Sequence, residues 1–270
     1  MRGRRKQKAR RKRIFGVVTK GKALQQKPLR PQRKRRMVKR TGARQAGPEW
    51  LIGIGYVNRP DLLKRALNSI SAFRHKTVVI DNSPDHNLQA HTLSVEVYTP
   101  DVPLTFSQTM NALYRLAAER GCKAAVILHN DAEPPPRTVR KFVRKVERLL
   151  RYGGRWGAVF THYHTLAAFR LKAVRRTGEW DTFLPRYFAD NDYYRRMRLA
   201  GYTIVETGLP VAHHLGGSAT IKSDRELAFL NSVTFPLYEE YYKQKWGGIP
   251  GQETFLEAFN LRLNEKGAAE

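Results

Sequence analysis

The sequence predicts an α/β fold with a mostly parallel sheet between helices, preceded by a separate and strongly basic segment. From Trp50 onward, short continuous apolar runs alternate with stretches of helical periodicity, and polar residues follow several of the apolar runs. Continuous apolar runs are typical of strands buried on both faces, and their alternation with helices is typical of a parallel sheet. The basic segment is visible in the charge distribution alone.

The first 44 residues hold 20 of the 50 Lys and Arg residues and no Asp or Glu. The remaining residues hold 30 basic and 23 acidic side chains, so they supply only +7 of the net charge of +27. Such a segment buries too little apolar surface to offset its ordering entropy. We therefore expect residues 1–47 to be a disordered tail and residues 48–270 to fold. A polyanion, nucleic acid or an anionic membrane surface, is the expected partner of residues 1–44; a solubility or localisation tail is the alternative.

The first half of the folded part is expected to contain four strands and two helices. The strands are predicted at residues 50–57, 77–83, 94–99 and 124–128. A helix begins near Pro60, a residue that suits the first helical turn. A second helix, over residues 106–121, is expected to be capped by Ser107 and ended by Gly121.

The second half continues the same alternation. An amphipathic helix with Arg and Lys on its outer face follows the prolines at 134–136 and ends at "YGG". Strands are predicted at residues 156–164 and 202–207, with a helix beginning near Asp190 between them. A long polar and aromatic helix is expected from about Asp224 to Trp246.

Polar residues follow three of the predicted strands: Asn58 and Arg59, then Asp81 and Asn82, then residues 129–131. In parallel sheets, ligands bind at the carboxyl ends of the strands. The sequence therefore predicts a ligand site at this edge. A dinucleotide site is disfavoured, because "GIGYVN" lacks the third glycine of the G-x-G-x-x-G fingerprint.

A single cysteine, Cys122, excludes an intramolecular disulfide and fits a reducing, cytoplasmic location. No apolar run is long enough to span a membrane.

Three clusters could carry chemistry. Asn130 and Asp131 could bind Mg²⁺ or Mn²⁺ through oxygen atoms, or form an ordinary Asx turn. The pair Asp190 and Asp192 could supply a general base, or only cap a helix. His213, in "HHLGGSAT", could contact a metal or a phosphate, with Ser218 and Thr220 as hydrogen-bond donors.

These segments, in this order, resemble the inverting nucleotide-sugar glycosyltransferases of the GT-A fold, family 2, over about residues 50–255. "NRPDLLKRALNSI" and "VVIDNS" match the ends of the family's first two strands. "HND" stands in the place of the metal-binding D-x-D, and "GEWDTFLPRYFADND" matches the segment that carries the base. "HHLGGS" matches a downstream H-x-x-G-G-S, and "YYKQKWGG" resembles the tail of bacterial and phage members.

The resemblance implies a role for each site residue. A UDP-sugar is the expected donor, Asp131 and His213 are the implied ligands of Mn²⁺ or Mg²⁺, and Asp190 is the implied base, with Asp192 as its fallback. The implied donor-binding residues are Tyr56, Asn58, Arg59, Asp81, Asn82, Asn111 and Asn130.

Two departures from the family pattern keep a second hypothesis open. His129 replaces the first Asp of D-x-D, and Ala189 replaces the Glu before the base. We expect a metal-dependent inverting glycosyltransferase whose acceptor is modified DNA, as in phages acting in the host cytoplasm; protein, glycan and lipid acceptors remain open. The alternative is a catalytically lapsed GT-A domain that binds nucleic acid or acts as a scaffold.

Overall fold

The computed structural model describes residues 49–86, 88 and 93–261, so the predicted disordered tail lies outside the described residues. A seven-stranded sheet has the order β3-β2-β1-β4-β7-β6-β8. Only β7 runs antiparallel to its neighbours, and the other adjacent pairs are parallel. The predicted α/β class with a mostly parallel sheet is therefore confirmed. The strands are β1 (Trp50–Tyr56), β2 (Thr77–Asp81), β3 (Glu96–Tyr98), β4 (Ala124–Leu128), β6 (Trp156–Phe160), β7 (Leu166–Arg170) and β8 (Thr203–Glu206).

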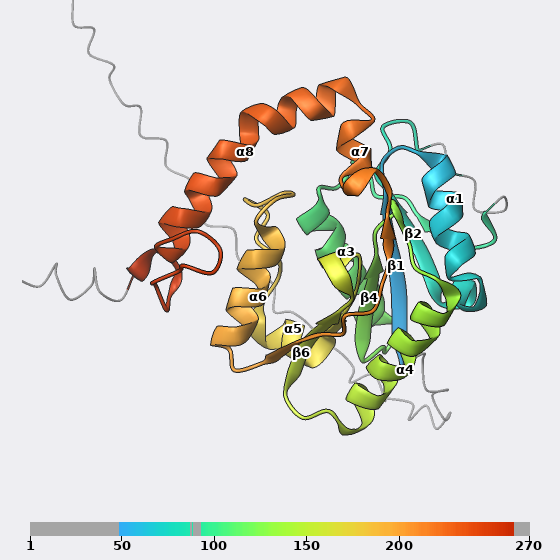
Figure 1. The fold of residues 1–270 in the computed structure, drawn as a ribbon, viewed down its shortest axis with the longest axis horizontal. Coiled ribbons are helices and arrows are strands. Elements are labelled where there is room, and N and C mark those ends of the chain that lie inside the picture. The colour runs from blue at the N-terminus through green and yellow to red at the C-terminus, as the bar shows by residue number, and fades with distance from the viewer. Residues whose placement is uncertain (1–48, 87, 89–92, 262–270) are drawn as a thin grey trace, which may run out of the picture. The chain divides into compact units, whose positions relative to one another are not determined.

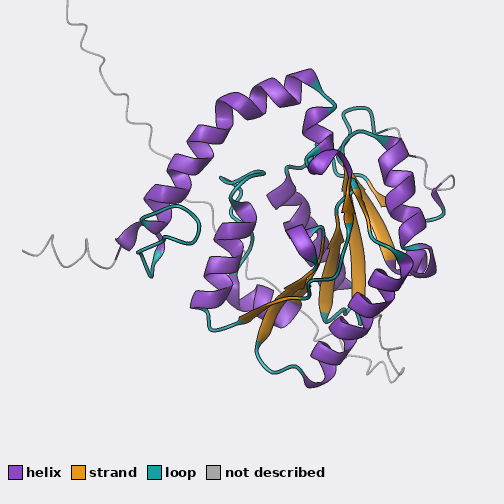
Figure 2. Ribbon diagram, in the orientation of Figure 1, coloured by secondary structure: helices purple, strands orange, loops and turns teal. Residues whose placement is uncertain are grey.

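Helices cover both faces of this sheet. Helices α1 and α4 pack against one face, while α3, α5 and α6 pack against the other, and each face has its own apolar core (Figure 1). Figure 2 shows the strands enclosed between these helical layers. The helices are α1 (Pro60–Ser69), α3 (Phe106–Glu119), α4 (Pro136–Tyr152), α5 (Leu171–Thr177), α6 (Ala189–Leu199), α7 (Ala219–Lys222) and α8 (Arg225–Trp246), with 3₁₀ turns η1 (Ser71–Lys76), η2 (His162–His164), η3 (His214–Gly216) and η4 (Ala258–Asn260).

Helix α3 approaches β1 closely because β1 contains glycines. A Cβ atom on Gly53 would lie 2.5 Å from Leu113 Cδ1, and one on Gly55 would lie 3.1 Å from Thr109 Cγ2. A side chain at Gly53 would therefore displace the Leu113 side chain from its place between α3 and β1. The close approach places the N-terminal half of α3 beside the carboxyl end of β1.

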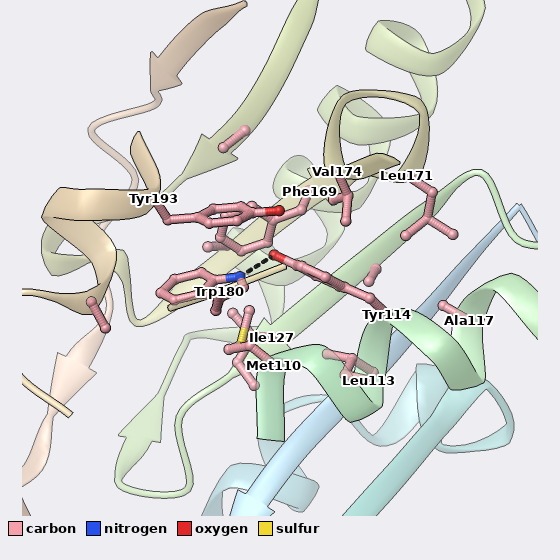
Figure 3. Packing of buried hydrophobic residues seen from close by; sticks show 14 of the residues in the cluster. Met110, Leu113, Tyr114, Ala117, Ile127, Phe169, Leu171, Val174, Trp180 and Tyr193 are labelled. Carbon is pink, nitrogen blue, oxygen red and sulfur yellow. Dashed lines mark hydrogen bonds between the residues drawn. The ribbon is translucent and has the colours of Figure 1, made fainter. Parts of the chain in front are cut away.

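An aromatic cluster fixes α3 and α6 to β7 (Figure 3). The Trp180 ring stacks on Tyr193 with centroids 4.4 Å apart, and its indole Nε1 donates a 2.8 Å hydrogen bond to the Tyr114 hydroxyl. Phe169 meets the edge of Trp180 at 5.8 Å. Because the buried indole N–H has a hydrogen-bond partner, the cluster leaves no donor unsatisfied at this point. Both Phe169 and Trp180 also line the cavity described below.

The predicted cap of α3 was wrong by two residues. The N-cap is Thr105, whose side chain accepts from the backbone N–H of Gln108 while the Gln108 side chain accepts from the N–H of Thr105. This reciprocal pair forms a capping box. The hydroxyl of Ser107 instead donates to the carbonyl oxygen of Leu184.

The predicted strand over residues 156–164 was too long. Strand β6 ends at Phe160, the turn η2 follows, and β7 returns antiparallel along β6. The hydroxyl of Thr161 donates to the carbonyl of Leu166, and that of Thr165 donates to the carbonyl of His162. These local side-chain bonds satisfy the backbone of the reversal, which the apolar pattern alone does not show.

A small second sheet brings a distant segment to the main one. Strand β5 (Ala132–Glu133) pairs antiparallel with β9 (Ala212–His213), in a register that sets Ala132 opposite His213. The predicted ends of the last helix are confirmed: Asp224 caps α8 by accepting from the N–H of Leu227, and α8 ends at Trp246. Among the described helices, none is long and apolar enough to cross a membrane.

Candidate functional site

A cavity of about 510 Å³ lies at the carboxyl ends of the strands, where the sequence predicts a ligand site. Its wall includes side chains that follow β2 and β4, residues of α3, residues of α6 and of the segment before it, and residues of β9 and of the segment after it. Five of the predicted site residues line it: Asn82, Asn130, Asp131, Asp190 and His213. The structure therefore gathers residues that are up to 131 positions apart in the chain.

Three side chains in this cavity could hold a metal ion. His129, Asp131 and His213 each offer one ligand atom, and these atoms lie within 4.8 Å of one another. Asp131 Oδ1 lies 3.2 Å from His213 Nε2, and Asp131 Oδ2 accepts a 2.9 Å hydrogen bond from the backbone N–H of Ala219. The two imidazole rings are 5.9 Å apart.

The electrostatics of the three residues suit a cation. Burial lowers the pKa of His129, which outweighs the opposing effect of Asp131 and leaves the imidazole neutral with a free lone pair. Burial alone would raise the pKa of Asp131, but hydrogen bonds from His213 and from the Ala219 N–H lower it overall. A neutral imidazole and an ionised carboxylate are the forms that bind metals.

Backbone pairing and a glycine position His213 in this cluster. The β5–β9 register holds it opposite Ala132, directly after Asp131 in the chain. Gly217 has φ = 87°, and a Cβ atom there would lie 2.7 Å from Cε1 of the His213 ring. A side chain at Gly217 would therefore strain the backbone and would also collide with the His213 ring. Beside the cluster, His214 Nε2 lies 2.9 Å from Glu133 Oε2.

The donor set distinguishes between the two predicted cations. Mg²⁺ prefers oxygen ligands in an octahedral shell, whereas imidazole nitrogens are common ligands of softer first-row metals. Two imidazoles and one carboxylate therefore fit a first-row transition ion better than Mg²⁺, and of the two predicted cations only Mn²⁺ is such an ion. His129, which the resemblance marks as a departure from D-x-D, is the residue that makes this difference.

The candidate base, Asp190, lies on the same cavity, in the first turn of α6. Its Oδ2 atom is 3.2 Å from His164 Nδ1, and its Oδ1 atom accepts from the N–H of Asn191. Burial would raise the pKa of Asp190, but the hydrogen bond and charge of His164 lower it overall. Asp190 is therefore ionised at neutral pH and can accept a proton.

The other predicted donor-binding residues do not line the cavity; they support its rim. The Asp81 carboxylate is fully buried and accepts from Ser83 and from the N–H of Leu88. The Asn111 side chain holds both backbone groups of Trp180. Asn58 donates to the carbonyl of Thr220, and its Oδ1 is buried without a partner.

The two remaining predicted donor-binding residues, Arg59 and Tyr56, also lie outside the cavity lining. Arg59 has a positive φ at the N-cap of α1 and binds Asp61 and Ser223, and Tyr56 is buried at the end of β1. The direct donor contacts expected of Asp81, Asn111, Asn58, Arg59 and Tyr56 stay predictions.

Asp192, the predicted fallback base, lies outside the cavity. Its carboxylate is fully buried and is held by Arg196, Lys245 and the Trp246 indole N–H at 2.7–2.9 Å. A carboxylate enclosed by two cations and an indole has no path to a substrate proton. The geometry therefore favours Asp190 for that role.

Sequence reasoning missed several residues of the cavity wall, above all His164. Arg186, Tyr187 and Tyr194 line it as well, and the Tyr187 hydroxyl lies 3.2 Å from the Ser218 hydroxyl. His164 belongs to the "HYH" tripeptide, which the sequence pattern places in a strand over residues 156–164. The two histidines were the available signal, since histidine is less often fully buried than the apolar residues of a strand.

Comparisons with known proteins give a fold likeness only. No family model and no curated protein matches the sequence. Glucosyl-3-phosphoglycerate synthase from Mycobacterium tuberculosis, solved with Mn²⁺ and UDP-glucose, is similar at 18% identity and a TM-score of 0.47, over 69% of this chain and 79% of that chain. The same enzyme in complex with phosphoglyceric acid is similar at 17% identity and a TM-score of 0.49, over 70% of this chain and 77% of that chain. S. aureus TarS, residues 1–349, is similar at 11% identity and a TM-score of 0.47, over 60% of this chain and 58% of that chain. Likeness at this level carries no argument about activity.

Proposed function

We propose that this chain is a metal-dependent glycosyltransferase of the GT-A type that moves a sugar from a nucleotide-sugar donor to an acceptor hydroxyl. The observation that supports it best is the shared cavity: a His129–Asp131–His213 cluster and an ionised Asp190 face the same space. This chemistry needs a cation for a diphosphate and a separate base for a hydroxyl, and the cavity offers both. A UDP-sugar is the proposed donor.

The residues divide the work as follows. Asn82 and Asn130 line the cavity beside the cluster and would orient the donor through hydrogen bonds. Mn²⁺ held by His129, Asp131 and His213 would supply Lewis-acid stabilisation of the leaving diphosphate. Asp190 takes the proton of the acceptor hydroxyl as its oxygen bonds to the anomeric carbon. The bond from that carbon to the diphosphate oxygen breaks, and attack from the opposite face inverts the configuration.

The substitution Asp190→Asn tests the assignment of the base. Asn is nearly the same size but cannot accept the proton, so transfer should fall by about two to four orders of magnitude. Binding of UDP and Mn²⁺, measured by calorimetry, should survive because Asp190 is not one of the proposed metal ligands. Near-normal turnover in the variant would contradict the assignment.

A lapsed GT-A domain that binds nucleic acid remains the second candidate. The observation in its favour is Ala189, which is buried at the start of α6 and puts no carboxylate beside Asp190. Mn²⁺-dependent hydrolysis of a UDP-sugar by the purified chain would exclude it. Modified DNA as the acceptor, and a phage protein acting in the host cytoplasm, stay predictions.

A further inference from the structure

Helix α4 carries a row of cations on its solvent side, called here the α4 basic face. All of its members are exposed, and none forms a salt bridge within the part of the chain that the structure describes. Figure 1 shows α4 along the outside of the sheet, on the same side as α1. The face consists of Arg137, Arg140, Lys141, Arg144, Lys145, Arg148 and Arg151.

This face accounts for nearly all of the excess charge of the folded part. Residues 45–270 hold 30 basic and 23 acidic side chains, a net charge of +7. Helix α4 holds seven of those basic residues and one acidic residue, a net charge of +6. The rest of residues 45–270 is therefore at +1, with 23 basic and 22 acidic side chains. A solvated surface needs no such concentration, because mixed charges serve solubility equally well.

The opposite side of α4 is committed to the core. Val139, Phe142, Val143 and Val146 are buried against the sheet. The single acid of the helix, Glu147, turns away from the row and accepts a 3.2 Å hydrogen bond from the indole N–H of Trp50. The helix therefore holds its cations in a fixed row, at helical spacings of three and four residues.

The sign of the charge limits what can cover this face. Residues 1–44 carry 20 cations and no acid, so they repel it. A second copy that presented the same face would repel it as well. The surface therefore fits an anionic partner that offers many charges at regular spacing.

Nucleic acid fits better than a membrane. A helix that binds a lipid surface inserts apolar side chains, and the large ones of α4 already face the sheet, apart from Tyr152 at its end. The row runs from Arg137 to Arg151, a rise of about 21 Å, which is the axial length of about six phosphates on one strand of a duplex. Five of the seven cations are Arg, whose planar fork matches phosphate oxygens in pairs.

We propose that the α4 basic face binds the phosphodiester backbone of nucleic acid, without reading its sequence. The proposal does not depend on glycosyl transfer, since α4 contributes no residue to the cavity lining. It also differs from a contact through residues 1–44, because it assigns the contact to a rigid helix of the folded part.

The test compares two triple variants of the full chain. Arg140→Gln, Arg144→Gln and Arg148→Gln remove three cations from the face, and Gln is a good helix former at exposed positions. The control, Lys172→Gln, Arg175→Gln and Arg176→Gln, removes three exposed cations from α5, on the other face of the sheet. Affinity for a random-sequence DNA duplex is measured between about 50 and 200 mM salt.

Each phosphate contact contributes about 0.9 to the slope of log K against log salt, so the α4 variant should lose about 2 to 3 from the slope. The α5 variant should keep the wild-type slope. Residues 1–44 are present in wild type and in both variants, so they contribute equally to all three slopes. Equal slopes in wild type and α4 variant would overturn the proposal, as would equal losses in both variants. The α4 variant is also tested for binding to vesicles rich in phosphatidylserine. If it loses that binding while its DNA slope stays unchanged, the face binds membranes instead.

Discussion

At the scale of single residues, His164 is the side chain that contacts the candidate base, Asp190. It adopts a left-handed backbone conformation with φ = 57°, and its ring is held between Phe160, with centroids 3.9 Å apart, and the edge of Tyr194 at 4.9 Å. Its Nδ1 atom therefore has little freedom and faces Asp190. The hydrogen bond lowers the pKa of Asp190 against the effect of burial, which keeps the carboxylate ionised into the acidic range.

The variant His164→Phe keeps an aromatic ring but removes the hydrogen-bond partner, so the pKa of Asp190 should rise. A base works only above its pKa, and the acidic limb of the kcat/KM profile for UDP-sugar turnover should move to higher pH. His164→Asn is the matched control, because Asn tolerates the left-handed conformation and retains an N–H donor. It should keep the limb nearer its wild-type position. A limb that stays in place in the Phe variant would show that His164 has only a packing role.

At the scale of elements, a buried ionic network joins α8 to α6. Lys245 Nζ lies 2.6 Å from Asp181 Oδ2 and 2.7 Å from Asp192 Oδ1, while Arg196 binds the other oxygen of Asp192. The Trp246 indole adds a hydrogen bond to Asp192. Two cations and two carboxylates balance, so the network is stable only while all four are present. It fixes the end of α8 against the first turns of α6, which carry Asp190.

Replacing Lys245 with Met should be strongly destabilising, because it leaves two carboxylates near each other without their shared cation. The expected loss in the free energy of unfolding is about 3 to 5 kcal/mol, measured in urea. Lys243→Met, two residues away, removes a surface pair with Glu239 and should leave the unfolding midpoint unchanged. A similar loss in both variants would mean that the helix itself, and not the network, was damaged.

The same network predicts a pH dependence of stability. Burial raises the pKa of Asp181, but the hydrogen bond from Lys245 lowers it overall, below its ordinary value of 3.8. When the pKa of a carboxyl group is lower in the folded state, the group stabilises the fold fully at a pH above its pKa in the unfolded chain. This stabilisation is lost as the pH falls through its pKa in the folded state. The difference in the free energy of unfolding between wild type and Lys245→Met should therefore narrow from about pH 5 to pH 3. A constant gap would exclude a role for Asp181.

At the scale of the whole molecule, the sequence predicted the elements whose signals are local. Strands β1, β2 and β4 are continuous apolar runs that end in polar residues, and α8 has a capping Asp224 at its start. Because parallel strands share one carboxyl edge, the meeting of Asn82, Asn130 and Asp131 could be predicted from their order alone. Asp190 lies on α6, and only the family resemblance indicated its place in the site.

The missed elements depend on contacts between distant segments. Strand β7 reverses direction through the side chains of Thr161 and Thr165, and the two-residue strands β5 and β9 have no periodicity to detect. The roles of His164 and His129 follow from those elements, since β7 fixes the turn that holds His164 and β9 brings His213 to His129. A sequence pattern does not record which turn lies beside which strand.

The site itself joins the segment of residues 212–222 to the sheet, and this gives a test of the metal cluster that needs no substrate. Besides the β5–β9 pairing, His213 Nε2 and the Ala219 N–H contact the carboxylate of Asp131, at 3.2 and 2.9 Å. Mn²⁺ bound by His129, Asp131 and His213 would add a stronger link; at 100 times its dissociation constant, it stabilises the bound state by about 2.7 kcal/mol.

Hydrogen exchange in residues 212–222 should therefore slow when Mn²⁺ is added to the wild type, and Mg²⁺ should have a smaller effect. His129→Ala should abolish the response while leaving exchange without metal unchanged, because His129 makes no hydrogen bond to the segment through its side chain. Exchange that ignores Mn²⁺ in the wild type would remove the cation from the proposed function.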